Sequence, residues 1–259
     1  MKYEDMKGIR RSDLWLINRS PAHFRYAMDN PEPPTPALTF GIAAHKYILE
    51  PDSFMDEFAV APDCDRRTKQ GKETFAAFMN QTNGKSIISK EEFGRLKEMR
   101  EALESHEVAN ALFSNGEYEK PFLWTDPMTG EDCKVKADCI GTWDGKDYVL
   151  DYKTTSSCEG NNFEHDTKKY GYKFQAGMYV EGIFQATLVS RKFAFVVQEK
   201  NPPYAVRVYI CTDEFVAQGY DKFRELIGIY HQCKESGVWY GYDGLNFTPT
   251  ELLEDATHD

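Results

Sequence analysis

The sequence lacks several features that would place it in a large class of proteins. No apolar run among its 259 residues approaches the roughly 18–20 residues that a membrane span requires. The first five residues (Met1-Lys2-Tyr3-Glu4-Asp5) contain no apolar segment typical of a signal peptide. Internal repeats and low-complexity blocks are also absent. We therefore expect a cytoplasmic protein without a membrane partner, and a hydrophobic content of 41% is sufficient for a packed core.

Cysteine is sparse and scattered. No two of the six cysteines form a CxxC pair, and their spacings match no zinc or iron–sulfur pattern. In a reducing compartment we expect free thiols that pack as small hydrophobic side chains. The six are Cys64, Cys133, Cys139, Cys158, Cys211 and Cys233.

Positive charge is also scarce, with 31 Lys and Arg against 42 Asp and Glu and a net charge of −11. This balance weakens the case for a nucleic-acid partner, since phosphate binding requires Lys and Arg, but the distribution of charge matters more than the sum. Residues 243–259 hold five acidic residues and no basic ones, which predicts a solvated acidic tail. Residues 66–104 hold nine basic and six acidic residues, a net charge of +3. The acidic sum therefore leaves a nucleic-acid partner open.

The hydrophobic periodicity predicts an α/β protein with a mixed central sheet flanked by helices. We expect one domain over residues 1–242, with its core at about 37–236, followed by the tail 243–259. Residues 31–36 (Pro-Glu-Pro-Pro-Thr-Pro) predict a stiff break, a capping box begins at Ser89, and Asp213 is the predicted cap of the last helix. The predicted helices cover residues 12–17, 21 onward, 37–49, 71–79, 89–106, 166–184 and 213–235, and the predicted strands cover residues 119–125, 133–143, 148–154, 192–199 and 205–211.

Two carboxylates and a lysine lie near the ends of predicted neighbouring strands, in the order Asp138, then Asp151-Tyr152-Lys153. If the hairpin is in register, the carboxylates converge on one hard cation such as Mg²⁺ or Mn²⁺. Lys153 projects from the same strand face as Asp151, where its ammonium can orient a water or stabilise developing charge, whereas Tyr152 points into the packing. The alternation of the return strand places Lys134, Lys136 and Asp138 on one face and Val135, Ala137 and Cys139 on the other.

An ordinary charged strand is the competing interpretation, because an Asp–Lys pair two residues apart forms a weak ion pair worth at most about 1 kcal/mol. Further residues favour the metal site. Gln175 and Tyr179 share one face of the following helix, and His45 lies on an otherwise apolar helix. Each has its own alternative, a helix surface for the first two and a satisfied core histidine for the third.

Together these residues resemble the PD-(D/E)xK nuclease superfamily. Within it they are most similar to the RecE / exonuclease VIII-like branch, which is related to lambda exonuclease and to the RecB nuclease domain. The resemblance covers residues 12–236. Two positions depart from the name-giving motif, since the second acid is Asp151 rather than Glu and Ala137 precedes the first acid in place of Pro.

The resemblance implies a function and a set of roles. His45, Asp138, Asp151 and the carbonyl of Tyr152 would ligate Mg²⁺ or Mn²⁺, and Lys153 would assist the attacking water. Gln175 and Tyr179 would support the site and contact DNA, while Glu119 is either an outer metal ligand or a surface carboxylate. The implied activity is a metal-dependent DNA exonuclease, 5′→3′ on double-stranded ends in recombination, with a single-strand annealing protein as partner. Relatives form rings around DNA, which implies a homo-oligomer.

Other functions remain open at this point. A single-strand or structure-specific nuclease would have the same fold. A non-catalytic DNA-binding or assembly module would have no use for a buried carboxylate pair. A carbohydrate or small-molecule hydrolase with Asp138 and Asp151 as acid and base would explain neither Lys153 nor Gln175. The iron–sulfur members of the superfamily, including the CRISPR adaptation nucleases, need clustered cysteines that this sequence lacks.

Overall fold

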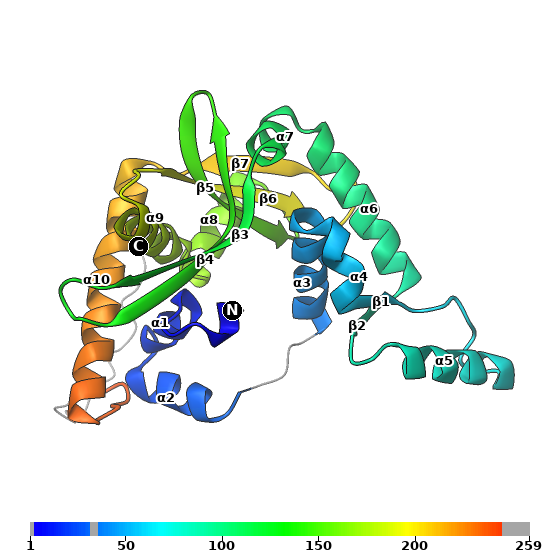
Figure 1. Cartoon of the computed structure of the whole chain (residues 1–259), viewed down its shortest axis with the longest axis horizontal. Coiled ribbons are helices and arrows are strands. Elements are labelled where there is room, and N and C mark those ends of the chain that lie inside the picture. Colours follow the sequence, from blue (N-terminus) through cyan, green and yellow to red (C-terminus); the bar gives the residue numbers. More distant parts are fainter. Residues whose placement is uncertain (1–2, 32–35, 245–259) are drawn as a thin grey trace, which may run out of the picture.

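The computed structural model describes residues 3–31 and 36–244, and its centre is a five-stranded mixed sheet (Figure 1). Its strands are β3 (Glu117–Thr125), β4 (Asp132–Trp143), β5 (Lys146–Thr155), β6 (Lys192–Glu199) and β7 (Val206–Ile210). Their order in the sheet follows the sequence, and all neighbours are antiparallel except β5 and β6. That parallel pair requires a crossover, which α8 (Gly160–Lys169) and α9 (Tyr172–Thr187) supply. The expected mixed sheet flanked by helices is confirmed.

Helices cover both faces of the sheet, and each face has its own core. Val149 of β5 packs into the first core, whereas Leu150 and Tyr152 pack into the second, as the alternation of a strand requires. The first core is covered by α1 (Arg11–Ile17), α2 (Pro21–Asp29), α8, α9 and α10 (Asp213–Ser236). The second is covered by α3 (Pro36–Leu49), α4 (Phe54–Glu57), α6 (Lys90–Ser105) and α7 (Glu107–Ser114). The remaining elements are the 3-10 helices η1 (Tyr3–Asp5) and η2 (Pro51–Ser53), the parallel pair β1 (Phe58–Val60) and β2 (Ser86–Ile88), and α5 (Lys69–Gln81).

Two glycines let α9 and α10 pack backbone against backbone. A Cβ at Gly177 would lie 2.1 Å from the Tyr220 nitrogen, and one at Gly219 would lie 1.8 Å from the Lys173 carbonyl oxygen. Neither distance is possible for real atoms, so the crossing requires glycine at both positions. The contact holds α9 against the sheet from outside, and α9 carries Gln175 and Tyr179.

Several predicted elements are confirmed and some are wrong. The capping box at Ser89 forms, and every predicted strand is present within two residues of its expected ends. The single helix expected over residues 166–184 is wrong, because Gly171 adopts a left-handed conformation (φ +66°) and divides it into α8 and α9. The cap of α10 is Thr212 rather than Asp213, since the Thr212 hydroxyl accepts the Phe215 N–H at 3.1 Å. Residues 32–35 of the proline-rich break and 245–259 of the predicted tail lie outside the described residues.

Candidate active site

Asp138 on β4 is the centre of the candidate site. Its side chain is buried, with 8% of the residue exposed. Its Oδ2 accepts the backbone N–H of Tyr152 at 2.7 Å and lies 2.9 Å from Nε2 of His45 on α3. The hydrogen bond from Tyr152 joins β4 to β5 where regular pairing has stopped, since the β4–β5 ladder begins at Cys139 and Leu150. The Asp138 carboxylate therefore takes the place of a backbone acceptor between the two strands.

The expected alternation of β4 is wrong at Asp138. Ala137 belongs to the first core and Cys139 to the second, although an undisturbed strand would point both side chains the same way. The cause lies on β3, where Glu119 has a positive φ (51°) and is skipped in the pairing opposite Asp138. Such a local distortion re-aims side chains, and here it directs Glu119 and Asp138 toward His45.

Glu119, His45 and Asp138 offer three ligand atoms that all lie within 4.8 Å of one another. His45 Nδ1 lies 3.5 Å from Glu119 Oε1, and Lys136 lies against the other oxygen of Glu119. The strand distortion thus places Glu119 beside the two predicted ligands rather than on the open surface.

Asp151 on β5 is more deeply buried, with 2% exposed. Gln175 Nε2 donates a hydrogen bond to its Oδ1, and the Lys153 ammonium lies against its Oδ2 as an ion pair. That contact lacks hydrogen-bond geometry, so Oδ2 is a buried oxygen that accepts no hydrogen bond, as is Oε1 of Glu119. As predicted, Lys153 shares the face of Asp151, while Tyr152 points into the second core.

The two oxygens face the Lys153 ammonium and the His45 ring but accept no hydrogen bond, whereas buried carboxylate oxygens normally accept one, and this favours a further positive ligand such as a divalent cation. Carboxylate oxygens suit Mg²⁺ or Mn²⁺, whereas an imidazole is more typical of transition-metal sites. The residues present therefore fit such an ion. The cation would be held by the cluster of His45, Glu119 and Asp138. Asp151 is not part of that cluster in the structure, and its Oδ2 faces the Lys153 ammonium.

The two carboxyl groups have opposite pKa shifts. Burial alone would raise the pKa of Asp138, but the charge and hydrogen bond of His45, helped by Lys153, hold it below its ordinary value. Burial raises the pKa of Asp151, and Lys153 offsets this only in part while the Asp138 charge adds to it. Burial lowers the pKa of His45, yet Asp138 and Glu119 outweigh burial and bring it above its usual value. Ionised Asp151 thus lacks sufficient positive charge nearby, which a bound cation would supply.

Tyr179 lies one turn after Gln175 on α9 and is near both acids. Burial raises the pKa of Tyr179 well above its ordinary value, and the charges of Asp151 and Asp138 raise it further. Its ring contacts Phe193 edge-on at 6.1 Å between centroids. Among the described residues its hydroxyl makes no hydrogen bond, so this group remains available to a ligand.

Sequence reasoning missed two residues that position the site. Arg11 donates from one guanidinium nitrogen to the carbonyls of Tyr170 and Gly171, the latter at 3.0 Å, and so ties α1 to the start of α9. Gln198 is fully buried, accepting from the Tyr152 hydroxyl at 2.6 Å and donating to the Met99 carbonyl at 2.6 Å. Gln198 could have been found from the sequence, because it directly follows five apolar residues of β6 and such a pattern predicts a buried polar side chain. No comparable pattern marked Arg11.

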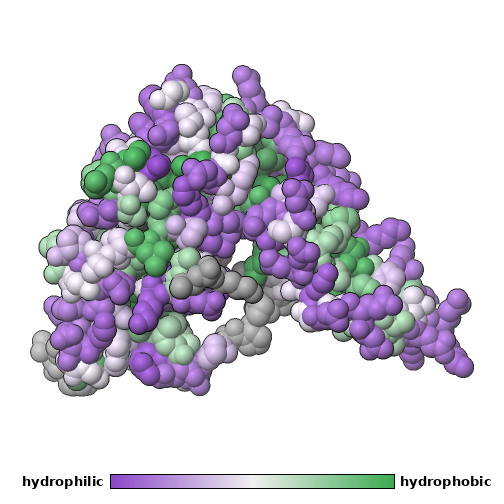
Figure 2. All heavy atoms as spheres, in the orientation of Figure 1, coloured by the Kyte–Doolittle hydropathy of each residue, from purple (hydrophilic) through white to green (hydrophobic). Residues whose placement is uncertain are grey.

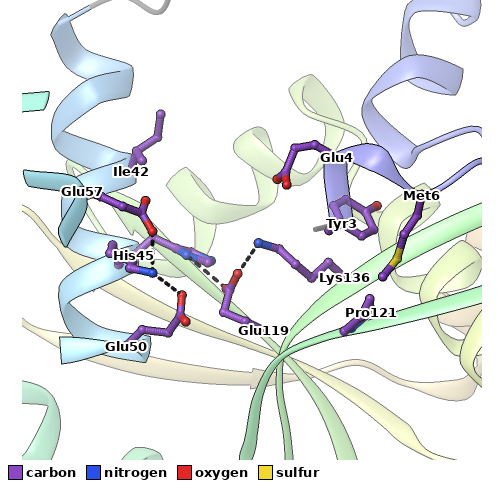
Figure 3. Close-up of a pocket in the computed structure, with 11 residues that line it drawn as sticks. Tyr3, Glu4, Met6, Ile42, His45, Glu50, Glu57, Glu119, Pro121 and Lys136 are labelled. Carbon is purple, nitrogen blue, oxygen red and sulfur yellow. Dashed lines mark hydrogen bonds and ion pairs between the residues drawn. The ribbon is translucent and has the colours of Figure 1, made fainter. Parts of the chain in front are cut away.

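A cavity of about 600 Å³ opens beside the ligand cluster (Figure 3). Ile42 and His45 of α3 form one wall, Glu119 and Lys136 lie on the strands, and Tyr3, Glu4 and Met6 form the opposite wall. Buried Lys134 holds that wall in place, since its ammonium donates to the carbonyls of Tyr3 at 2.9 Å and Met6 at 2.5 Å. The N-terminal segment is therefore part of the site. The other lining residues are Lys46, Glu50, Glu57 and Pro121.

Residues 11–245 match the model of a family described as a PDDEXK-like domain of unknown function (DUF3799). The chain belongs to this family. The superfamily expected from the sequence is thereby confirmed, and the RecE-like branch stays a prediction. The comparison with curated proteins found none that matches this chain.

One of the solved structures that match this chain shares its fold. The structure of a "Putative exonuclease" from Eubacterium rectale matches with a TM-score of 0.59 at 11% identity, over 98% of this chain and 96% of that chain. The protein SSO0001 matches at 20% identity over 72% of this chain and 84% of that one, with a TM-score of 0.32. LHK-Exo in complex with dAMP matches at 12% identity over 75% and 92%, with a TM-score of 0.26. The last two scores are too low to indicate a common fold.

Among the described residues, no helix of the PDDEXK-like domain is long and apolar enough to cross a membrane.

Proposed function

We propose that this PDDEXK-like domain is a metal-dependent DNA exonuclease that uses Mg²⁺ or Mn²⁺. The observation that carries the proposal is the cluster of His45, Glu119 and Asp138, with the unsatisfied oxygen of Asp151 and the ammonium of Lys153 beside it. In a structural ion pair, buried carboxylate oxygens usually accept a hydrogen bond, whereas these two do not. A carbohydrate hydrolase would not need Lys153 against one of its two acids.

The proposed mechanism assigns a task to each residue. His45, Asp138, Asp151 and the Tyr152 carbonyl would hold the cation, with Glu119 as a further ligand directly or through water. A bound divalent cation lowers the pKa of a water and stabilises charge on the phosphodiester. Lys153 orients the attacking water and stabilises negative charge that develops on the phosphate. Gln175 fixes the rotamer of Asp151 through its hydrogen bond, and the Tyr179 hydroxyl contacts the DNA backbone.

We further propose that the enzyme acts in the cytoplasm, 5′→3′ from double-stranded ends in recombination. A homo-oligomeric ring and a single-strand annealing partner belong to the same proposal. In this proposal the DNA end would enter the cavity beside the ligand cluster.

A digestion time course tests the proposal. Linear duplex labelled at either the 5′ or the 3′ end should lose nucleotides in Mg²⁺, stop with EDTA and reveal the polarity. A closed circle separates exonuclease from endonuclease, and single-stranded DNA separates the same-fold alternative. Asp151→Ala and Lys153→Ala should each abolish digestion. Wild-type protein that binds DNA yet digests none of these substrates would favour a non-catalytic binding module.

A further inference from the structure

The segment from β1 through α5 to β2, residues 58–88, projects from the body of the molecule and is called the arm below (Figure 1). Its root is fixed. β1 and β2 pair in parallel from Phe58 and Ser86 onward, and Phe58 stacks on Phe54 of the second core at 4.7 Å between ring centroids. The ammonium of Lys85 donates to the Met55 carbonyl at 2.6 Å. The arm therefore extends from α4 in a defined direction.

The root of the arm adjoins the candidate active site. Glu57, the last residue of α4, lines the cavity in Figure 3, and the arm begins at the next residue. Lys46, the residue after His45 on α3, forms an ion pair with Glu57, with its ammonium 2.7 Å from Oε1. The α5 helix, 13 residues long, then extends about 20 Å at 1.5 Å per residue. The arm therefore starts at the rim of the cavity and leads away from it.

The outer part of the arm is basic in an otherwise acidic chain. The arm as a whole has five basic and three acidic residues, a net charge of +2, whereas the whole chain carries −11. Residues 66–81 within it contain four basic residues and one acidic residue. All four basic residues are exposed: Arg66, Arg67, Lys69 and Lys72. Figure 2 shows mainly hydrophilic side chains over this projecting end.

Two of these cations lack the carboxylate partner that some helical cations have. Elsewhere Arg100 lies 2.7 Å from Glu104 and Lys222 lies 2.8 Å from Glu225. Lys69 is 4.0 Å from Glu73, its nearest carboxylate, while Arg67 and Lys72 have no carboxylate within 4.0 Å in the described part of the chain. Their charge is thus available to an external anion.

The local structure presents the cations outward. Gly71, Phe75 and Phe78 share the inner face of α5, with the Arg66 guanidinium over the Phe75 ring at 4.3 Å. Lys69 and Lys72 are three residues apart on the other face. A turn in which Asp65 Oδ1 accepts the Arg67 N–H at 2.9 Å fixes the backbone just before the helix.

We propose that the arm binds the sugar-phosphate backbone of duplex DNA ahead of the end held at the active site. This inference rests on the proposed nuclease function and adds a DNA path to it. The four exposed cations lie together just before α5 and in its first turn, which suits them to contact neighbouring phosphates spaced about 3.4 Å apart along one DNA strand. Cations that contact phosphates contribute affinity without sequence preference.

The test compares two double variants in steady-state digestion of a blunt linear duplex with Mg²⁺. Arg67→Gln/Lys72→Gln removes two exposed arm charges that have no carboxylate within 4.0 Å in the described part of the chain. Lys146→Gln/Lys192→Gln removes two exposed charges at the start of β5 and β6, the ends of these strands away from Asp151 and Lys153. We expect the arm variant to raise KM about tenfold at about 50 mM salt with kcat unchanged. The slope of log(kcat/KM) against log salt should fall by about 1.8, since each lost phosphate contact contributes about 0.9, and the control should match wild type.

The outcomes separate the inference from the function it rests on. If wild type digests duplex and the arm variant has the same KM and salt slope, the arm inference is overturned and the nuclease proposal stands. A change of oligomeric state in the arm variant with KM unaltered would make the arm a contact between copies of the chain. A KM increase confined to single-stranded substrate would also overturn the proposal of a duplex contact. If wild type digests no DNA, both proposals fall together.

Discussion

At the scale of single residues, the site combines two acids in opposite electrostatic states. His45 stabilises Asp138 as a carboxylate. Burial instead destabilises the charged form of Asp151, and one of its oxygens accepts no hydrogen bond. A buried carboxylate with a raised pKa is typical of functional sites. A purely structural role would favour a fully paired or a neutral group at this position. The charge of Asp151 is therefore better explained by a ligand than by folding.

Asp151→Asn should stabilise the metal-free fold. The folded-state pKa of Asp151 is raised, so its contribution to stability is present at low pH and is lost as pH rises through that pKa. The neutral amide avoids this loss, and its Oδ1 can still accept from Gln175. Its Nδ2 cannot pair with the Lys153 ammonium, which turns toward solvent because 24% of that side chain is exposed. In EDTA at neutral pH we expect a higher Tm for the variant, by about 2–4 °C for each kcal/mol gained. Thermal unfolding from pH 7 downward should show the two curves converging, and a lower Tm of the variant at pH 7 would contradict the account.

Glu119→Gln tests whether this residue belongs to the metal site. The amide retains the size of the side chain but removes its negative charge beside His45 and Asp138. The Mg²⁺ concentration for half-maximal activity should rise roughly 10–100-fold, the range typical of groups supporting a metal ligand. Glu117→Gln is the matched control, since Glu117 is exposed two residues earlier on β3 and pairs only with Lys120 among the described residues. Equal Mg²⁺ requirements in both variants would assign Glu119 to the surface.

At the scale of elements, the site depends on how α9 is held. Arg11 fixes the start of α9, and α10 presses against its outer side at Gly219, so that Gln175 reaches Asp151. None of these contacts is encoded in local periodicity. They join segments far apart in the chain, which explains why the sequence predicted the residues Gln175 and Tyr179 but missed Arg11.

Gly219→Ala should disrupt this packing. The new Cβ would overlap the Lys173 carbonyl, so the helices must separate, at a cost of about 1–3 kcal/mol. Gly228→Ala in the same helix is the control, because a Cβ there meets nothing within 4 Å and alanine is the better helix former by up to about 1 kcal/mol. Urea unfolding should show a lower midpoint for the first and a higher one for the second. Unchanged stability of Gly219→Ala would contradict the close crossing.

At the scale of the whole molecule, the central sheet could be predicted from the sequence, whereas the local details that build the site could not. Alternating strands and turn residues predicted all five strands of the central sheet. Periodicity failed at Gly171, where a conformation rather than a pattern ends the helix, and at β1 and β2, which are too short to show alternation. It also failed at Asp138, because the distortion at Glu119 depends on pairing between strands. The metal ligands were predicted from the resemblance to a family. That their side chains lie close together could be seen only in the fold.

The proposed ring makes a prediction about mass. Native mass spectrometry at micromolar concentration should give a defined multiple of the monomer, independent of Mg²⁺. A monomer at every concentration would remove the ring and leave the chemistry of the site untouched.

The most direct test of the central claim is the rate of nucleotide release from linear duplex in Mg²⁺ by wild type and by Asp151→Asn. We predict that the variant is slower by at least about 10²-fold, the scale expected for losing one key charge of an electrostatic site, although its Tm is not reduced. Loss of activity in a protein of equal or greater stability cannot result from unfolding. A variant that digests duplex at the wild-type rate would contradict the assignment of Asp151 to a catalytic metal centre.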